Sequence, residues 1–489
     1  MKRRQFIKVT TGSTLVALVG TSQLLTACHT EEDMIGEPNW IVEGAFNRQL
    51  VIPPVVTGDI QLTAKAISGE MLNDKATSML SYRDGMIGPL IIANKGDTVN
   101  VKLMNYLLEQ TNIHWHGLIL PADMDGHPKD VTSTGGELQY VLPIQQRGGT
   151  YWYHPHPHGS TARQVFMGLA GMFLVRDQEE LGLQLPSGEF ELPLIIQDKR
   201  FDGSALDYSP TDEEIILGYL GEQIVVNGIS SPVASVANVW HRLRLLNGST
   251  ARVYNLSFSN GLPFQVIGSD GGLLAAPEHA TSILLGPGER ADILVDFSTL
   301  SVGDEVFLVS NKFSEFNEQG RQRFSIMKFA IGRAGSSNFI LPSSLSTVSI
   351  IPEALAVKTR SFNIGLMIDE EGHGTDMGRH SINGLTFDMQ RIDATVDAGT
   401  TEIWEFDNSG GDEIHPMHIH GVQFQILQRF GGRNSIIATE KGWKDTVLVM
   451  PGERVRVIMT FSQHKGVFVF HCHNLEHEDD GMMLNFEIV

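Results

Sequence analysis

The sequence predicts an all-β protein built from several β-sandwich domains in tandem. Short alternating segments are separated by glycine and proline, of which the chain has 50 and 20, and few stretches favour a helix. Two of these segments recur later in the chain. The 489 residues leave room for about three domains at roughly 150 residues each, so we expect three sandwiches with separate cores.

The segment "DTVNVKL" illustrates the strand pattern. Val99, Val101 and Leu103 fall on one face of an extended segment, whereas Asn100 and Lys102 fall on the other. A period of two predicts a half-buried strand with one face toward a core.

Two combinations of a turn and a strand each occur twice. "PGERADILVDF" begins at Pro287 and "PGERVRVIMTF" begins at Pro451, about 164 positions later. Likewise, "GDTVNVKLMN" from Gly96 resembles "GTTEIWEFDN" from Gly399. Repetition of a glycine turn with an alternating strand favours repeated domains, each made of two packed sheets.

The domain boundaries are expected where polar residues and turn formers gather. Such segments follow Asp177 and Gly332. They predict a first domain at 39-178, a second at 179-337 and a third at 338-489, after a leader at 1-28.

The first residues have the features of an export leader. Arg3 and Arg4 precede a mildly apolar stretch, which resembles a twin-arginine signal. "LTAC" at residues 25–28 resembles a bacterial lipoprotein cleavage box, so Cys28 is a candidate lipid anchor; ordinary cleavage nearby is the alternative. We therefore predict a protein of the periplasm or cell envelope, in contact with a membrane only through Cys28.

Charge and cysteine content exclude several classes of protein. The formal net charge of -21 argues against nucleic acid as a partner. After the leader, no apolar run reaches the ~18 residues that a membrane-spanning helix needs. With Cys28 and Cys472 as its two cysteines, the chain has no disulfide framework, so Cys472 requires another explanation.

Four His-x-His pairs point to a metal cluster. In a strand, residues two apart project from the same face, so each pair presents two imidazoles side by side. One pair would mean little, but four pairs from both ends of the chain predict a shared cluster. The pairs are His114 and His116, His154 and His156, His418 and His420, and His471 and His473.

The peptide "FHCHNLEHEDDGMM", residues 470–483, indicates which metal. Alternation places His471 and His473 on one face and Cys472 on the other. One cysteine, two histidines and a weak methionine sulfur form the ligand set of a blue-copper electron-transfer site, which a structural zinc site would not use. The remaining ligands of this predicted set are His415, His477 and Met482.

The same peptide predicts an electron path. An electron on a copper at Cys472 can pass along the chain to His471 or His473, with a rise of only ~3.3 Å per strand residue. Eight imidazoles fit three coppers that share ligands three, three and two. Such a cluster could hold dioxygen and deliver several electrons to it.

The motifs "IHWHG", "YWYHPHPHG", "HPMHIHG" and "HCHNLEHEDDGM" resemble the four copper signatures of the three-domain multicopper oxidases. "PGERADILVDF" and "IIQDKRF" are most similar to bacterial laccases and periplasmic copper-efflux oxidases. The resemblance covers essentially the whole mature chain. It implies three cupredoxin-like Greek-key β-sandwich domains and four copper ions, one type 1, one type 2 and two type 3. One-electron oxidation of donors would be coupled to four-electron reduction of O2 to water.

The resemblance also implies a role for each ligand, whereas His158 matches a position that binds no metal. The type 1 copper would be held by His415, Cys472, His477 and Met482, and the type 2 copper by His114 and His418. The type 3 pair would take His116, His156 and His471 on one side and His154, His420 and His473 on the other.

Two carboxylic acids match family positions near the copper cluster. Asp125 in "ADMDG" corresponds to a carboxylate beside the type 2 and type 3 coppers, and Glu478 to one on a proton route. Both suit general acid work if their surroundings raise their pKa. The alternative is that each is a solvent-exposed acid. With Cys472 as ligand and electron conduit, these are the predicted catalytic residues.

The electron donor is less defined. Copper-efflux oxidases carry a long methionine-rich insertion over the type 1 site, whereas this chain has the short segment "LMIDEEGHGTDMGRH", and Glu413 replaces a family methionine. We expect the short lid to leave the edge of His477 open to phenols and aromatic amines. The segment is either a metal-binding or a solvated acidic loop. Its potential ligands are Met367, Asp369, Glu370, Glu371, His373, Asp376, Met377 and His380.

The predicted function is therefore a laccase-like oxidase, expected as a monomer. Oxidation of Cu(I) for periplasmic copper tolerance is the alternative, and Fe(II) or Mn(II) are further possible donors. A non-catalytic copper-binding or cell-division scaffold protein would be expected to have lost ligands, and all twelve family positions are filled here.

Overall fold

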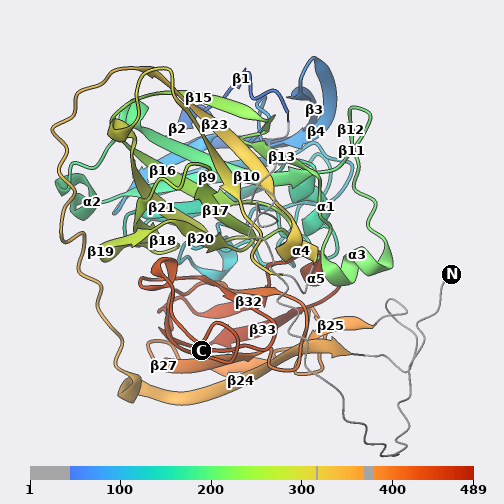
Figure 1. Ribbon diagram of the computed structural model, residues 1–489. Helices are drawn as coiled ribbons and strands as arrows, with labels where there is room; N and C mark the ends of the chain where they lie inside the picture. The colour runs from blue at the N-terminus through green and yellow to red at the C-terminus, as the bar shows by residue number, and fades with distance from the viewer. Residues whose placement is uncertain (1–43, 315–317, 368–377) are drawn as a thin grey trace, which may run out of the picture. The chain divides into compact units, whose positions relative to one another are not determined.

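The computed structural model describes residues 44–314, 318–367 and 378–489. The predicted leader with Cys28 and the residues from Asp369 to Met377 lie outside this part of the chain. None of the described helices has the length and apolar character needed to cross a membrane. Three pairs of sheets follow one another along the chain (Figure 1), so the prediction of an all-β protein of tandem sandwiches is confirmed.

The first sandwich consists of two four-stranded sheets with the core between them. On β6, Val99, Val101 and Leu103 are buried and Asn100 and Lys102 are half-buried, which confirms the predicted alternation. One sheet contains β4 (Lys75–Ser81), β3 (Ile60–Leu72), β6 (Thr98–Asn105) and β7 (Glu137–Pro143). The other contains β2 (Val55–Val56), β5 (Leu90–Asn94), β9 (Gly171–Arg176) and β8 (Gly149–Tyr153).

The second sandwich has a six-stranded and a seven-stranded sheet. β1, from the segment predicted as the first domain, pairs in parallel with β15 of this sandwich. The six-stranded sheet contains β1 (Arg48–Gln49), β15 (Pro232–Ala237), β23 (Phe324–Arg333), β22 (Glu305–Ser310), β17 (Tyr254–Phe258) and β20 (Ser282–Leu285). The other contains β14 (Ile229–Ser230), β13 (Gln223–Val226), β10 (Glu191–Lys199), β16 (Trp240–Asn247), β21 (Arg290–Asp296), β18 (Phe264–Ser269) and β19 (Gly272–Ala280). β11 (Phe201–Asp202) and β12 (Ala205–Leu206) form a separate ribbon.

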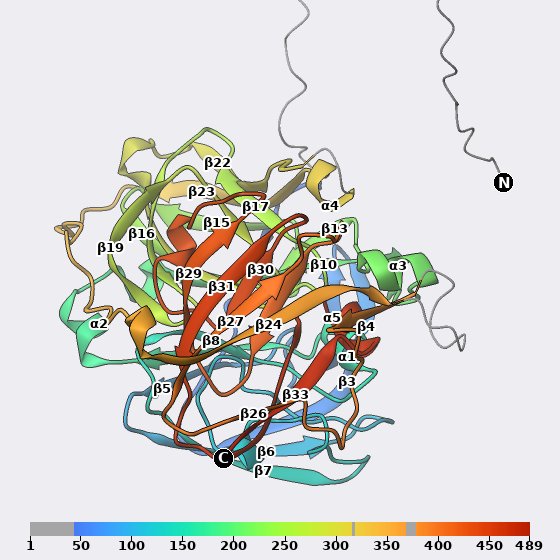
Figure 2. The ribbon, with the colours of Figure 1, turned by 90° about the horizontal axis from the view of Figure 1, so that it is seen from below.

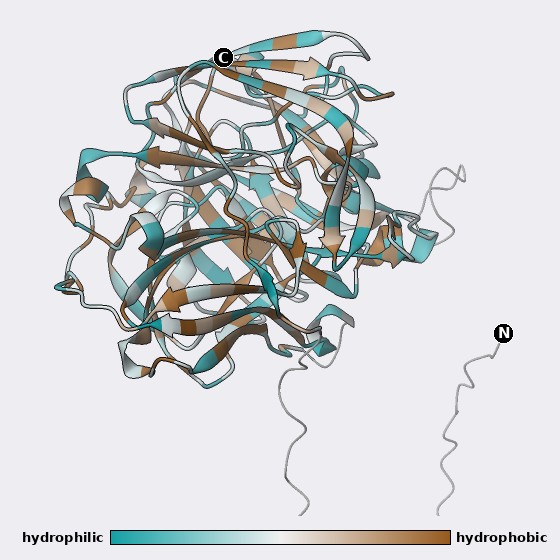
Figure 3. Ribbon diagram, turned by 90° about the horizontal axis from the view of Figure 1, so that it is seen from above, coloured by the Kyte–Doolittle hydropathy of each residue, from teal (hydrophilic) through white to brown (hydrophobic). Residues whose placement is uncertain are grey.

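The third sandwich has two five-stranded sheets, one of which lies in front in Figure 2. That sheet contains β25 (Arg379–Ile382), β24 (Ala356–Met367), β27 (Thr401–Asp407), β31 (Arg454–Thr460) and β29 (Phe424–Phe430). The other contains β26 (Ala394–Val396), β33 (Met483–Ile488), β32 (Gly466–Cys472), β28 (His415–Ile419) and β30 (Thr446–Val449). Figure 3 shows hydrophobic residues gathered along the strands, as packed sheets require.

The repeated "PGER" segments form the same turn in both sandwiches. A carboxylate oxygen of Glu289 accepts a hydrogen bond from the Gly286 N–H at 2.7 Å, and one of Glu453 accepts from the Met450 N–H at 3.1 Å. The next residue begins β21 in the first case and β31 in the second. The repeated "PGER" sequence therefore forms a turn that precedes a strand in both the second and the third sandwich.

The helices are short and lie between the strands. α5 packs against both α1 and α3, so segments of all three sandwiches meet beside the last sheet (Figure 1). The helices are α1 (Thr161–Phe166), α2 (Gln178–Gly182), α3 (Asp212–Leu217), α4 (Glu318–Arg321) and α5 (Leu475–Asp479).

Candidate metal centres

The four His-x-His pairs meet in the interior, where the first sandwich contacts the third. His114 and His154 form an antiparallel bridge, with N–H to O distances of 2.8 and 3.2 Å. In the last sandwich, β28 pairs with β32 so that His418 lies opposite His471. All eight rings are at most 1% exposed. The fold therefore brings together every histidine of the predicted cluster.

The ring nitrogens of these histidines converge in three groups. In the first, His156 Nε2 and His420 Nε2 lie 3.2 and 3.1 Å from His471 Nε2. In the second, which contains His116, His154 and His473, one nitrogen from each ring lies within 4.8 Å of the others. In the third, His114 Nε2 lies 3.3 Å from His418 Nε2, and a nitrogen of His116 lies within 4.8 Å of a nitrogen of each.

This grouping brings together His114 and His418, the predicted type 2 pair, and divides the other six rings differently from the predicted type 3 sets. The prediction placed His116 with His156 and His471, and His420 with His154 and His473. His116 and His420 exchange places in the structure. Contacts across domains set the orientation: His116 Nε2 lies 3.0 Å from Asp445 Oδ1, and His420 Nδ1 lies 2.7 Å from Asp125 Oδ2. Sequence spacing contains no information about those contacts.

The donor set suits a transition metal such as copper. Backbone oxygens accept hydrogen bonds from the outer nitrogens of four rings, which leaves Nε2 of each facing its group. Burial lowers the pKa of His154 and of His418 to about 3, so these imidazoles are neutral and can donate lone pairs. The rings held in this way are His114, His154, His418 and His471.

A second centre lies around Cys472. Its Sγ is 3.6 Å from Nδ1 of His415 and 3.6 Å from Nδ1 of His477, and these two nitrogens are 3.3 Å apart. Met482 is buried beside them, and its carbonyl accepts a hydrogen bond from the Cys472 N–H at 3.0 Å. Three of the four predicted ligands, His415, Cys472 and His477, therefore lie together, and Met482 belongs to the same buried core cluster as Cys472.

The two centres share β32. His471 faces the histidine cluster, whereas the adjacent Cys472 faces the second centre, which confirms the alternation expected from the sequence. Burial raises the pKa of the Cys472 thiol, so a bound cation is needed to hold the thiolate. The Asn474 N–H donates to Sγ at 3.4 Å, a contact of the kind that tunes such sulfur sites.

Asp125 lies against the cluster and is fully buried. Its Oδ2 is 2.7 Å from His420 Nδ1, and Oδ1 has no hydrogen-bond partner in the described part of the chain. Burial raises its pKa well above the usual value, which favours the protonated acid. The next residue, Gly126, has φ of 83°, and a Cβ there would lie 2.1 Å from the Ile113 carbonyl oxygen. The turn that presents Asp125 therefore requires glycine.

Glu478 is 1% exposed and faces the same cluster from α5. Its carboxylate oxygens lie 3.1 Å from His471 Nδ1 and 3.4 Å from His156 Nδ1. His471 Nδ1 donates to the Cys472 carbonyl instead, so neither oxygen of Glu478 is hydrogen-bonded within the described residues. The alternative of a solvent-exposed acid is wrong for both Asp125 and Glu478.

The expectation of an open His477 edge is wrong. The ring is 0% exposed, and its Nε2 lies 2.9 Å from both the Ile216 carbonyl oxygen and the Asn474 side-chain amide. Ile216 belongs to α3 of the second sandwich, which begins with a Thr211–Glu214 capping box. The residue that covers His477 therefore comes from another domain, and the length of the lid segment in the third domain does not predict it.

A buried network of ion pairs contacts the histidine cluster through Asp445, which lies beside His116. Arg290 Nη1 lies 2.7 Å from Asp445 Oδ1, and Lys444 Nζ lies 2.9 Å from Asp270 Oδ2. All four side chains are 0% exposed. Burial disfavours the Asp445 carboxylate, but Arg290 outweighs this and lowers its pKa, so Asp445 stays charged beside His116.

Replacement of Arg290 by methionine should destabilise the fold. Asp270 and Asp445 would remain buried without the guanidinium, and breaking such a pair costs about 3–5 kcal/mol of unfolding free energy. Urea unfolding measures the loss. Arg333→Met is the control, because the Arg333–Glu189 pair is more than half exposed and is worth about 0–1 kcal/mol. Equal unfolding midpoints for the two variants would contradict the prediction.

The sequence of this chain is similar to those of known proteins over most of its length. Three family profiles, each described as multicopper oxidase, match residues 63–180, 217–327 and 364–489. The multicopper oxidase mco of Staphylococcus haemolyticus is 36% identical over 86% of this chain and 87% of its own length. The chain belongs to the multicopper oxidase family. As a multicopper oxidase, it is a copper-binding oxidoreductase that uses O2 as electron acceptor.

Other relatives of this multicopper oxidase have different names. A laccase of Bacillus subtilis is 31% identical over 84% of this chain and 90% of its own length. The cell division protein FtsP of Escherichia coli is 35% identical over 81% of this chain and 82% of its own length. The structure of McoA multicopper oxidase from Aquifex aeolicus covers 90% of this chain and 99% of its own, with 36% identity and a TM-score of 0.83. The predicted cupredoxin-like fold is thereby confirmed.

Proposed function

We propose that this multicopper oxidase holds four copper ions and works as a laccase-like enzyme. The observation that carries the proposal is Cys472, which lies at one centre while its chain neighbours lie at the other. The type 1 site would consist of His415, Cys472, His477 and Met482, and the type 2 site of His114 and His418. The type 3 sites would consist of His116, His154 and His473, and of His156, His420 and His471.

Copper bound at these two centres would supply one-electron oxidation of a donor and four-electron reduction of O2 to water. The chain's part is to hold the centres at a fixed separation. β32 and the residue that follows it connect the Cys472 sulfur to the His471 and His473 rings through adjacent residues, with a rise of ~3.3 Å per strand residue. Burial of all these side chains excludes water from the path.

Asp125 and Glu478 are proposed to supply protons for the reduction of O2. Each presents a buried carboxyl oxygen without a hydrogen-bond partner among the described residues, close to an imidazole of the cluster. A group in this position can carry a proton as a general acid. Asp125 approaches His420 from the first sandwich, and Glu478 approaches His471 from α5.

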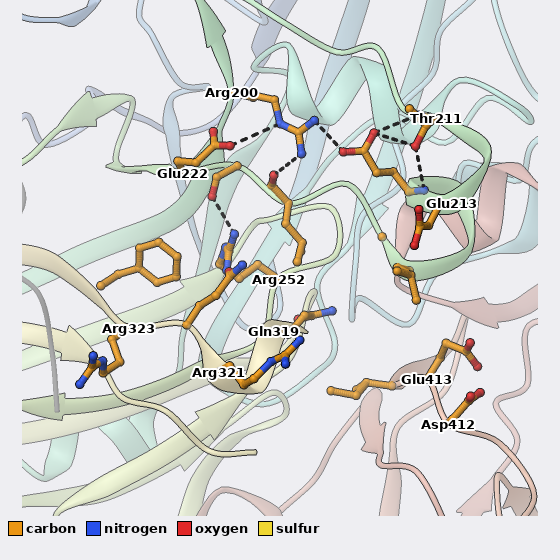
Figure 4. Close-up of a pocket in the computed structure, with 18 residues that line it drawn as sticks. Arg200, Thr211, Glu213, Glu222, Arg252, Gln319, Arg321, Arg323, Asp412 and Glu413 are labelled. Carbon is orange, nitrogen blue, oxygen red and sulfur yellow. Dashed lines mark hydrogen bonds and ion pairs between the residues drawn. The ribbon is translucent and has the colours of Figure 1, made fainter. Parts of the chain in front are cut away.

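The donor is proposed to bind in a cavity of about 880 Å³ next to the type 1 site. The end of α3 contributes Leu217, which directly follows the residue in contact with His477, and Ile414 directly precedes His415. Figure 4 shows Asp412 and Glu413 at the end of the cavity opposite Arg200 and Glu222. A cavity of this size with mixed polar and apolar walls suits a phenol or an aromatic amine.

Enlarging Leu217 should impair donor binding. Leu217→Trp is expected to raise KM for a dimethoxyphenol about tenfold, since a changed pocket contact is worth roughly 10–200-fold in specificity, while the colour stays unchanged. Steady-state oxygen uptake measures this effect. Leu181→Trp on α2 is the matched control, because Leu181 is likewise exposed on a short helix. Equal KM values for both variants would place the donor elsewhere.

A copper-loaded preparation tests the proposed function. We expect four coppers per chain, a strong blue colour that disappears when donor is added without oxygen, and oxygen uptake when both are present. A colourless protein, or zinc at the histidine cluster, would refute the proposal.

Oxidation of Cu(I) is the second candidate function. Asp412 and Glu413 line the cavity, and carboxylates there leave room for a metal ion, although Cu(I) prefers sulfur. Turnover of a dimethoxyphenol with and without added Cu(II) separates the two functions. Strict dependence on added copper would favour the metal donor, and independence would favour the phenol.

We also propose a place of action and a state of assembly. The first residues favour export by a twin-arginine route to the periplasm or cell envelope, with lipidation of Cys28 as an option. We propose a monomer, with domain boundaries near residues 178 and 337.

A further inference from the structure

His380, on β25, lies directly against the proposed type 1 site. Its ring stacks on that of His477, with centroids 3.7 Å apart and planes inclined by 19°. It also meets His415 edge to face, at 5.3 Å and 71°. One of its ring nitrogens lies within 4.8 Å of ring nitrogens of both His415 and His477. No other aromatic ring in the described residues stacks on His477.

The surroundings of His380 are unusual for a buried histidine. The side chain is 0% exposed, and neither Nδ1 nor Nε2 has a hydrogen-bond partner in the described part of the chain. Leaving two buried polar atoms unpaired costs stability, and a phenylalanine would fill similar space without that cost. Simple core filling therefore does not explain an imidazole here.

The stacked geometry argues against His380 as a ligand of the same metal as His477. The lone pair of an imidazole nitrogen lies in the ring plane, and two nearly parallel planes 3.7 Å apart cannot both contain one metal ion.

We propose that His380 is a positioning residue of the type 1 centre, an inference that rests on the proposed function. The His477 ring is held at its edge by the Ile216 carbonyl oxygen and covered on one face by His380. Rotation of the ring about its Cβ–Cγ bond would break the first contact and clash with the second. The two contacts together fix His477 Nδ1 toward the Cys472 sulfur.

Three variants test this role. His380→Ala removes the stacked ring and should shift the blue absorption band, the copper hyperfine splitting and the reduction potential, with activity lowered by about tenfold or more, as for other residues that orient metal ligands. His380→Phe keeps a stacked ring and should restore all of these properties. His241→Ala is the matched control, because His241 is a buried histidine of the second sandwich, and it should leave the spectra unchanged.

Two results would overturn the proposal. An unchanged spectrum in His380→Ala would show that the stack does not orient His477. An equal disturbance in His380→Phe and His380→Ala would show that a nitrogen of His380, not its stacked ring, acts at the centre.

A measurement without copper separates failure of this inference from failure of the proposed function. In the metal-free protein, nitrogen NMR of the histidine side chains should give a sharp His477 Nε2–H signal in wild type and His380→Phe, and a broadened one in His380→Ala. Equally sharp signals in all three would contradict positioning by His380, whatever the copper content of the loaded enzyme.

Discussion

Cys472→Ser is expected to abolish the blue colour and the oxidation of donors together. A serine hydroxyl keeps the size of the side chain but offers no soft thiolate, so the site around His415 and His477 would lose the ligand that gives a blue-copper centre its character. It would also lose the link from that centre to His471 and His473 along the chain. Absorption spectra and oxygen uptake of the copper-loaded variant measure both losses.

The control uses the other cysteine of the chain. Cys28→Ser lies in the predicted leader, so the purified variant should keep its colour and turnover. The histidine cluster is intact in Cys472→Ser and should still bind copper, which metal analysis can verify. Substantial donor oxidation by Cys472→Ser would contradict the proposed electron path.

Glu478→Gln is expected to lower kcat by about 100-fold or more while the blue colour persists. Glutamine is isosteric but cannot deliver a proton, and general acid catalysis contributes roughly 10²–10⁴-fold to rate. Glu478 contacts imidazoles of the cluster and not the sulfur site, so the colour should remain. Steady-state kinetics and spectra of the same preparation distinguish the two effects.

Glu476→Gln is the matched control for Glu478→Gln. Glu476 is on the same helix and 2% exposed, but its carboxylate accepts a hydrogen bond from the Tyr208 hydroxyl at 3.1 Å. It should therefore change kcat much less. If Glu476→Gln slows turnover as much as Glu478→Gln, the proton enters by a different route or the helix itself has moved.

Much of this site could be predicted from the sequence because strand geometry is local. Residues two apart in an extended segment share a face, which predicts the shared direction of each His-x-His pair and the opposite placement of Cys472. In the structure β28 ends at Ile419 and β32 at Cys472, so His420 and His473 lie just after their strands. The repeated "PGER" turns likewise show their structure in the sequence. These features require no knowledge of what the strand packs against.

The predictions that the structure contradicts, the grouping of the histidines and the open edge of His477, depend on contacts between domains. Asp445 and Asp125 orient His116 and His420, and this long-range hydrogen bonding decides which group of rings each histidine joins. In the same way, α3 of the second sandwich covers His477. The sequence did not predict the proposed role of His380, because its stacking on His477 depends on how β25 packs against the last sandwich. Spacing along the chain does not determine such packing.

The histidine cluster draws its two halves from residues far apart in the chain: His114 and His418, whose Nε2 atoms lie 3.3 Å apart, are 304 positions from each other. A ribosome would therefore release nearly the entire polypeptide before the metal pocket could close. Copper acquisition is then an event of the finished molecule, because a chain that ends before its last sheet would keep only four of the eight histidines of the cluster.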